Sequence, residues 1–473
     1  MSRLDLKHVH IVGIGGAGTS ALANILLQQD IGVSGSDKTP SAVTERLIDR
    51  GVSISYTESY DNVPDHASMV VYSAAVREEH LERKRAREMG IPERKYSEVL
   101  GMLTGLRQTI AICGTHGKTT TTSMIAGLLH RARKRPSWLV GGVPTCLPAS
   151  SNWDNGTNFV VEACEYDRSF LNLEPSAIVL HNIEPDHMEY FGTFENLVQA
   201  FADFTALLAP RSVLFANWDN EAVRDVARSC KRRVIRYGIE HEEATYRARD
   251  IEIVDGYPVF SLMKGKRELT RVRLAVPGKV NVINGLASAT VGHWAGLEPE
   301  FIASALAETT GVKRRFEVIG DYNTAPVVDD YAHHPTAVRE LVQTARAAYP
   351  ERWITFVFQA HQYARLLRFF GEFTDALSGV DEVLVCRTYA AREAGVMPGE
   401  PEERLAKELR RRGVVSLALS TFDGVLNHLR AGWRPDKAFI TVGAGDVTEI
   451  GHRLVEEGYI RSGRYDKSGI PRS

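Results

Sequence analysis

The run Cys113–Thr120 (CGTHGKTT) constrains this chain more than any other stretch. It stands between residues 108–112, which have the pattern of a short buried strand, and residues 121–130, which have the pattern of a helix. Glycines in such a turn let backbone N–H groups approach phosphate oxygens, and the helix N-terminus adds partial positive charge. We expect Lys118 to reach the β- and γ-phosphates of a nucleotide and the Thr119 hydroxyl to bind Mg²⁺. The run therefore predicts an α/β domain built around a phosphate loop.

This loop is shorter than the common G-x-x-x-x-G-K-[ST] pattern, because Ile112 stands five residues before Gly117, where a glycine is usual. A plain helix N-terminus with glycines as turn residues is the alternative interpretation. It is disfavoured because it does not account for Lys-Thr directly after a glycine at a strand-to-helix switch.

The bulk composition bounds the class of protein. At 473 residues the chain is long enough for about three domains, and 44% hydrophobic with 25% charged residues is ordinary for a globular protein. The net charge of −2 gives no general attraction to nucleic acid or membranes, and neither is expected as a partner. Five scattered cysteines without a C-x-x-C pair disfavour zinc and disulfide frameworks. With no leader pattern and no long apolar run, a cytoplasmic location is expected.

Strand and helix patterns alternate along most of the chain. They predict an α/β fold of three domains: an N-terminal Rossmann-like domain over 1–106, a central P-loop ATPase-like domain with a parallel sheet over 107–310, and a C-terminal Rossmann-like domain over 311–473. Residues 240–276 differ, since they form short alternating segments with little helix. They predict a small antiparallel flap at the edge of the central sheet.

A second glycine loop, Gly13–Gly18 (GIGGAG), fits G-x-G-x-x-G between a predicted strand and a predicted helix, and Asp37 follows at the end of the next strand. Alone, the pattern predicts a dinucleotide-binding loop whose backbone approaches a diphosphate. A structural turn without a ligand is the alternative. With two phosphate loops the chain is expected to bind two nucleotides, which disfavours a simple dehydrogenase.

Four further segments follow predicted strands or open a predicted helix. Glu162 begins an acidic run whose position at a strand's carboxyl end suits Mg²⁺ over the phosphates, and His187 is a candidate metal or substrate-carboxylate contact. Asp329–Pro335 (DDYAHHP) is expected to contact a nucleotide, with a metal site as the alternative. Asn281 and Asn284 are candidates for hydrogen bonds to adenine, or for local capping. A solvated or structural role is the alternative for the acidic run and for His187.

In their order along the chain, these segments resemble the Mur ligase family, which builds peptidoglycan precursors by ATP-driven amide formation. The resemblance covers essentially the whole chain and is nearest to the branch that adds L-alanine to UDP-N-acetylmuramate. It is carried by the following segments: Gly13–Gly18, Gly35–Asp37, Gly114–Thr120, Glu162, Asn182–Met188, Asn284, Arg314–Phe316, Asp329–Pro335 and Gly443–Asp446.

The resemblance implies ATP and Mg²⁺ as cofactors, UDP-N-acetylmuramate and L-alanine as substrates, an acyl phosphate intermediate, and a monomer or homodimer. It implies Lys118, Glu162 and His187 as catalytic residues, with Thr119, Glu162 and His187 on the metal. The implied ATP contacts are Gly114, Thr115, His116, Gly117, Lys118, Thr119, Thr120, Asn284, Arg315 and Asp330. The implied UDP-sugar contacts are Gly15, Gly16, Ala17, Gly18, Ser36, Asp37 and Ser73, and the implied amino-acid contacts are His334, His361 and Arg365.

The chain departs from the family pattern in three segments, one of which has Val280 before Asn281 where the family has His-Asn. Cys164 and Tyr166 stand where the acidic run usually has Asp and Ser, and Gln362 stands where an Arg is expected, which leaves His361 and Arg365 to hold the amino acid's carboxylate. The alternatives are the ligase that attaches a recycled tripeptide to UDP-N-acetylmuramate, an NAD(P)-dependent oxidoreductase and a P-loop ATPase switch. The sequence leaves the choice among L-Ala, Gly and L-Ser open.

Overall fold

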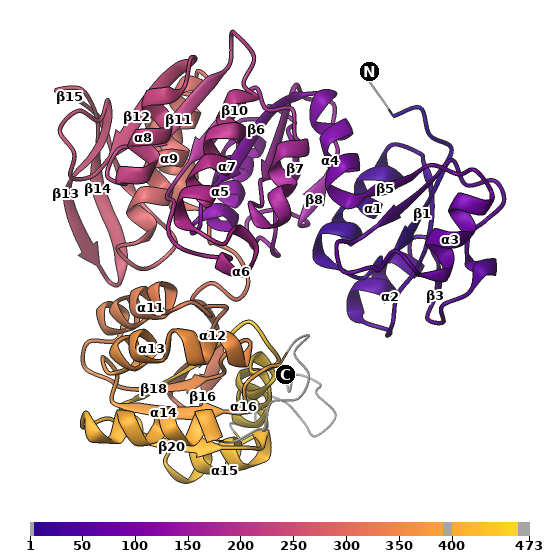
Figure 1. Ribbon diagram of the computed structural model, residues 1–473. Coiled ribbons are helices and arrows are strands. Elements are labelled where there is room, and N and C mark those ends of the chain that lie inside the picture. The colour runs from indigo at the N-terminus through magenta and orange to yellow at the C-terminus, as the bar shows by residue number, and fades with distance from the viewer. Residues whose placement is uncertain (1–3, 391–399, 462–473) are drawn as a thin grey trace, which may run out of the picture. The chain divides into compact units, whose positions relative to one another are not determined.

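The computed structural model describes residues 4–390 and 400–461. The chain separates into two compact units. The first comprises Met1–Asp250, Phe260–Val272 and Ile283–Thr309, and the second comprises Ile251–Val259, Arg273–Val282 and Thr310–Ser473. Over the described residues, the first unit contains a five-stranded sheet and most of a ten-stranded sheet, and the second contains a six-stranded sheet (Figure 1). The predicted α/β class is confirmed, whereas the domain boundaries at residues 106 and 310 stay predictions.

The N-terminal sheet is parallel, in the order β3-β2-β1-β4-β5. Strand β1 is central, so the loop that follows it lies where neighbouring connections diverge, which is the usual ligand position in such sheets. The elements are β1 (His8–Val12), α1 (Ala17–Gln28), β2 (Gly32–Ser36), α2 (Ala42–Ile48), β3 (Ser53–Ser55), η1 (Tyr60–Asn62), β4 (Met69–Tyr72), α3 (Leu81–Glu88), β5 (Glu93–Lys95) and α4 (Tyr96–Gly105).

The central sheet has the order β15-β14-β13-β12-β11-β10-β6-β9-β7-β8. Strands β13, β14 and β15 are consecutive at one edge and are joined by two-residue turns, which only antiparallel neighbours allow, so the predicted flap is confirmed. The strands are β6 (Gln108–Cys113), β7 (Ser137–Leu139), β8 (Ser151–Asn152), β9 (Asn158–Glu162), β10 (Ala177–Leu180), β11 (Val213–Asn217), β12 (Arg233–Gly238), β13 (Tyr246–Val254), β14 (Tyr257–Lys264) and β15 (Arg267–Arg273).

The helix after the phosphate loop begins earlier than its sequence pattern predicts. Helix α5 (Lys118–Arg131) starts at Lys118 because Gly117 adopts the left-handed backbone conformation (φ +83°) that turns the chain into the helix. The other helices of the first unit are η2 (Tyr166–Asn172), α6 (Met188–Phe191), α7 (Phe194–Ala206), α8 (Glu221–Ser229) and α10 (Pro299–Ala307), and α9 (Asn281–Trp294) spans the junction of the two units.

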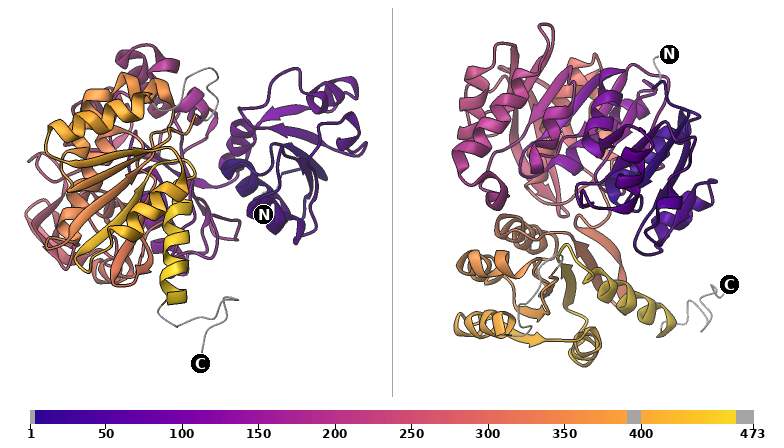
Figure 2. Two further views of the ribbon diagram at one scale, coloured as in Figure 1. Left: turned by 90° about the horizontal axis from the view of Figure 1, so that it is seen from below. Right: turned by 45° about the vertical axis from the view of Figure 1, so that its right-hand side comes forward.

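In the second unit the sheet order is β16-β17-β21-β18-β19-β20, and β16 alone pairs antiparallel with its neighbour. Alternate residues of β18 serve two cores: Phe356 and Phe358 pack with the α11, α13 and α14 side, and Val357 packs with the α15 and α16 side. Helices accordingly cover both faces of this sheet (Figure 2). The strands are β16 (Glu317–Tyr322), β17 (Ala325–Asp330), β18 (Trp353–Phe358), β19 (Glu382–Cys386), β20 (Val415–Leu419) and β21 (Lys437–Val442). The helices are α11 (Pro335–Ala348), α12 (Tyr363–Arg368), α13 (Phe370–Leu377), α14 (Glu400–Arg411), α15 (Phe422–Ala431) and α16 (Thr448–Arg461).

In the two described ranges, no helix is both long and apolar enough to cross a bilayer.

Candidate active site

Three predicted site segments meet at one edge of the central sheet. Strand β6 lies between β9 and β10, and its register pairs Ile112 with Glu162 and Cys113 with Leu180. Because these strands are parallel, the phosphate loop, the acidic run and the segment that begins at His181 all leave the sheet at its carboxyl edge. This is where open α/β sheets bind ligands.

Both loop glycines are required by the backbone. Gly114 has φ +133° and Gly117 has φ +83°, conformations that side chains other than glycine rarely adopt. A Cβ atom on Gly117 would lie 2.5 Å from Oδ1 of Asn284, and one on Gly114 would lie 3.0 Å from the backbone of Asn182. Asn284, predicted to contact adenine, is thus buried directly against the loop.

The Lys118 ammonium group is fixed inside the loop. Its Nζ atom donates to the carbonyl oxygens of Gly114 (2.6 Å) and Thr115 (3.1 Å), and it pairs with the buried carboxylate of Glu165 at 2.9 Å. Burial, the largest single influence, lowers the pKa of Lys118, but the neighbouring groups Glu165, Cys164 and Glu162 together outweigh it and raise that pKa above its usual range. The loop therefore holds a permanent cation at the N-terminus of α5.

Glu162 and Thr119 fit a magnesium ion that is also bound by phosphates. The Thr119 hydroxyl donates to Glu162 Oε1 at 3.1 Å, and the Gly141 N–H donates to the other oxygen, Oε2, at 2.9 Å. Within the described residues there is no group of three or more His, Cys, Asp or Glu side chains placed to hold a metal. Magnesium commonly takes one or two carboxylates and completes its shell with phosphate oxygens and water, so one carboxylate beside one hydroxyl suits that mode.

His187 lies against the acidic run. It is the N-cap residue of α6 with a left-handed backbone (φ 53°), and its ring centroid is 5.0 Å from that of Tyr166. Its Nε2 atom is 3.9 Å from Asp186 Oδ2. The residue that replaces the family's usual Ser thus packs on the predicted catalytic histidine.

The first glycine loop is braced from β2. The N–H of Gly15 donates to Asp37 Oδ2 at 2.7 Å, and the N–H of Gly13 donates to the Ser36 carbonyl at 2.8 Å. The Ser36 hydroxyl donates to the buried Glu82 carboxylate at 2.6 Å. Asp37 and Ser36 therefore shape the loop, whether or not they also contact a nucleotide.

Two more residues border that loop: Ser73, which was predicted, and Tyr96, which was not. A Cβ atom on Gly18 would lie 2.8 Å from Cζ of Tyr96, and one on Gly13 would lie 3.2 Å from Oγ of Ser73. A cavity of about 180 Å³ is lined by Ala17 and Gly18 together with Gly141 and Glu162. The first glycine loop thus shares a cavity with the predicted metal ligand Glu162, within the first unit.

The second unit gathers its own predicted segments at the ends of β17 and β21. Arg314 donates to Asp329 (3.1 Å) and to the carbonyl oxygens of Gly443 (2.7 Å) and Gly445 (3.2 Å). The Asp330 carboxylate accepts from the N–H groups of Phe316 and Ala332, both at 2.7 Å, and burial raises the pKa of this carboxyl. The guanidinium group of Arg315 lies over the Tyr331 ring.

The predicted amino-acid contacts come from the N-terminus of α11 and from the α12 region of this unit. The His361 ring stacks on Tyr389 and is 5.9 Å from the His333 ring, whereas His334 precedes α11 and packs on Phe369. Arg365 lies on α12, and its Nη1 atom is buried with no hydrogen-bond partner among the described residues. Gln362, the departure from the family pattern, has φ 73° at the start of the same helix.

Four residues at the site were absent from the predicted set: Glu165, Gly141, Tyr96 and Asn182. Glu165 and Asn182 come shortly after β9 and β10, so their position after predicted strands was a usable signal. Gly141 and Tyr96 carried no such signal, because only the folded chain brings them to Glu162 and Gly18.

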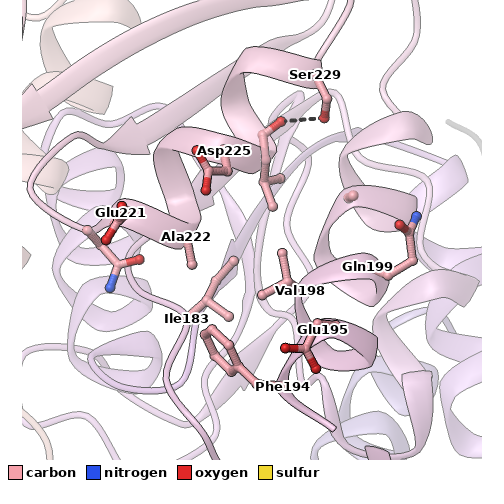
Figure 3. Close-up of a pocket in the computed structure, with 12 residues that line it drawn as sticks. Ile183, Phe194, Glu195, Val198, Gln199, Glu221, Ala222, Asp225 and Ser229 are labelled. Carbon is pink, nitrogen blue, oxygen red and sulfur yellow. Dashed lines mark hydrogen bonds between the residues drawn. The ribbon is translucent and has the colours of Figure 1, made fainter.

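A larger cavity, of about 570 Å³, lies between α7 and α8 (Figure 3). It is lined by Ile183, Phe194 and Val198 together with the acidic residues Glu195 and Asp225. None of the predicted site residues lines it, so size alone does not locate the candidate site.

The fold and the strand–glycine loop–helix geometry together have the architecture of a P-loop α/β enzyme. Three family models match successive parts of the chain: the Mur ligase family catalytic domain (residues 8–108), the Mur ligase middle domain (112–292) and the Mur ligase glutamate ligase domain (314–445). The chain belongs to the Mur ligase family, as its motifs predict.

Known relatives agree over nearly the full length. UDP-N-acetylmuramate–L-alanine ligases of Chlorobaculum tepidum and Acetivibrio thermocellus are 40% and 36% identical, over 95% of this chain and 95–96% of theirs. The structure of the UDP-N-acetylmuramate–alanine ligase of Thermotoga maritima has a TM-score of 0.83 at 27% identity, covering 97% of this chain and 100% of that one. A murein peptide ligase of Psychrobacter arcticus shares the fold, with a TM-score of 0.72 at 21% identity, over 96% and 98% of the two chains.

Proposed function

We propose that this chain forms the amide bond between L-alanine and the lactyl carboxylate of UDP-N-acetylmuramate, driven by ATP, in peptidoglycan precursor synthesis. The relatives at 36–40% identity carry that activity in their names. The observation that supports the proposal most directly is the fixed Lys118 cation beside the Thr119–Glu162 pair at the sheet's carboxyl edge.

ATP would place its phosphates over the first turn of α5, where N–H groups have no partner within the helix. Lys118 would exchange its bond to Glu165 for β- and γ-phosphate oxygens. Thr119 and Glu162 would hold Mg²⁺, which supplies charge neutralisation on the phosphates. His187, next to the acidic run, would join the metal site and orient the lactyl carboxylate.

The reaction proceeds in two steps. A lactyl carboxylate oxygen attacks the γ-phosphorus in line, the bond to the β-phosphate oxygen breaks, and ADP and an acyl phosphate result. The neutral amine of L-alanine then attacks the acyl carbon, phosphate leaves and the nitrogen loses a proton. Because acyl phosphates hydrolyse, the protein has to exclude water during both steps.

The remaining assignments of the proposal follow from the same resemblance. The UDP-sugar diphosphate would lie on Gly15–Gly18, and His334, His361 and Arg365 would bind the amino acid. ATP and Mg²⁺ are the proposed cofactors, a monomer or homodimer is the proposed assembly, and the cytoplasm is the proposed location.

Phosphate release tests the function directly. With ATP and Mg²⁺, we expect release only when UDP-N-acetylmuramate and L-alanine are both present, and much less with Gly or L-Ser. Release with a tripeptide in place of L-alanine would assign the recycling activity instead, an alternative that the relatives do not favour. Release without any sugar would indicate a simple ATPase.

A further inference from the structure

Asn182 holds the phosphate loop from the neighbouring strand. It follows β10 after one residue, and β10 pairs with β6, which leads into the loop. The N–H of Thr115 donates to the Asn182 carbonyl (3.0 Å), and the N–H of His116 donates to Oδ1 of its side chain (2.7 Å). The Nδ2 group of Asn182 donates in return to the His116 carbonyl (3.3 Å). One residue thus engages three polar groups of two consecutive loop residues.

These bonds decide which N–H groups the loop can offer to phosphate. The N–H groups of Thr115 and His116 are committed to Asn182, so they face the sheet. The N–H groups from Gly117 to Thr120 remain for a ligand, because the first residues of a helix have no intrahelical acceptor. A loop shorter than the common pattern therefore keeps a defined shape through a side chain outside it.

A second residue of the same segment, Glu184, also contacts the loop. The Thr115 hydroxyl accepts from the N–H of Glu184 at 2.9 Å, and Glu184 Oε2 lies 3.5 Å from His116 Nε2. The segment after β10 therefore holds the loop at both Thr115 and His116.

We propose that Asn182 is a positioning residue for the triphosphate, acting through the His116 peptide group without touching the nucleotide. This inference rests on the proposed binding of ATP at the Lys118 loop. It adds a residue to which the sequence assigned no role.

Steady-state kinetics of Asn182→Ala test the proposal. Loss of two hydrogen bonds to the loop is expected to raise KM for ATP about tenfold, with KM for UDP-N-acetylmuramate and for L-alanine within about twofold of wild type. General damage to the fold would instead lower the active fraction, and therefore kcat, without a selective change in KM. An unchanged KM for ATP, or an equal rise in all three KM values, would overturn the proposal.

Asn220→Ala is the matched control. Its side-chain oxygen also accepts from a backbone N–H, that of Val223 at 3.0 Å, but it caps α8 and lies outside the loop. We expect it to lower Tm slightly and to leave all three KM values unchanged. A selective rise in KM for ATP in this control would show that losing a side-chain cap outside the loop has the same effect, which would contradict the proposal.

Amide exchange in the wild-type chain is a second test, and it does not depend on the folding of any variant. Addition of ATP and Mg²⁺ is expected to protect the amides from Gly117 to Thr120 and to leave Thr115 and His116 as protected as before. New protection at His116 would show that its N–H turns to the nucleotide, and would refute the role of Asn182.

The two proposals fail in distinguishable ways. If wild type shows no ATP-dependent protection anywhere in the loop, the assignment of the loop to ATP is wrong. If ATP protects the loop but Asn182→Ala keeps a normal KM for ATP, the inference about Asn182 alone is wrong.

Discussion

At the scale of single residues, Lys118 is the group on which the proposed chemistry most depends. It is held by two carbonyl oxygens and Glu165, so it is oriented before any nucleotide arrives. Lys118→Ala is expected to lower kcat by about a thousandfold or more, because charge on the transferring phosphoryl group would lose its main protein counterion. Phosphate release under saturating substrates measures this, and the exposed Lys134→Ala is the control with expected wild-type turnover. A near-normal kcat in the Lys118 variant would contradict the loop assignment.

His181, directly after β10, is predicted to make stability depend on pH. Burial, and then the charge of Lys118, lower its pKa to about 3, and its Nδ1 atom is 3.0 Å from the Tyr237 hydroxyl. In the unfolded chain its pKa is near 6.5, so between pH 6.5 and 3 the unfolded state binds a proton that the folded state does not. Stability should therefore fall with acidification, by about 2 kcal/mol at pH 5 from this residue.

The comparison that isolates this effect is His181→Gln, which keeps an acceptor for Tyr237 but does not titrate. Denaturant unfolding at pH 7.5 and pH 5 should show a smaller loss of stability in the variant than in wild type. Equal losses in both proteins would mean that His181 is not the neutral buried group described.

At the scale of elements, the loop and α5 form one unit whose geometry depends on Gly117. Alanine there has to adopt φ +83° and meet Asn284 Oδ1 at 2.5 Å. At Gly90, φ is +68° and a Cβ atom would have no neighbouring atom within 4 Å, so alanine meets only the backbone strain. Gly90→Ala is expected to cost about 1 kcal/mol of stability, and Gly117→Ala more than that, with weaker ATP binding. Equal costs in thermal unfolding would show that the contact with Asn284 is readily relieved.

At the scale of the whole molecule, the contact pattern crosses the boundary predicted at residue 310. Ile251–Val259 and Arg273–Val282, which include parts of the flap, belong to the second unit. Gly256 packs on Ala348, and a Cβ on Gly278 would lie 2.4 Å from the Thr344 hydroxyl, both on α11. A chain cut at the predicted boundary would lack α11, so these segments would lose their contacts with it.

A chain of residues 1–310 is therefore expected to show faster amide exchange over 251–259 and 273–282 than the full chain, with little change in β6 and β10. Hydrogen-exchange mass spectrometry of the two proteins makes the comparison. Unchanged exchange in those two segments would mean that the flap is stable without the second unit, in support of the predicted boundary.

Much of this protein could be predicted because its signals are local. The strand–glycine–Lys–Thr–helix order depends on neighbours in the chain, so Gly117, Lys118 and α5 follow from the sequence, although α5 begins at Lys118 and not at Thr121. Parallel strands also place their carboxyl ends at one edge, which is why Glu162 and the segment after β10 were expected near the loop. The family and its three successive domains followed from the order of such segments.

By itself, then, the sequence determined the α/β class, the phosphate loop and the family, since each rests on residues a few positions apart. Only the tertiary structure decided which polar groups pair with one another. Glu165 pairs with Lys118, the Gly141 N–H donates to Glu162, and the His116 N–H donates to the Asn182 side chain. The tertiary structure also decided that the flap shares a unit with α11. These contacts join residues that are far apart in the chain, and hydrogen-bond distance and burial, which no local pattern encodes, select them.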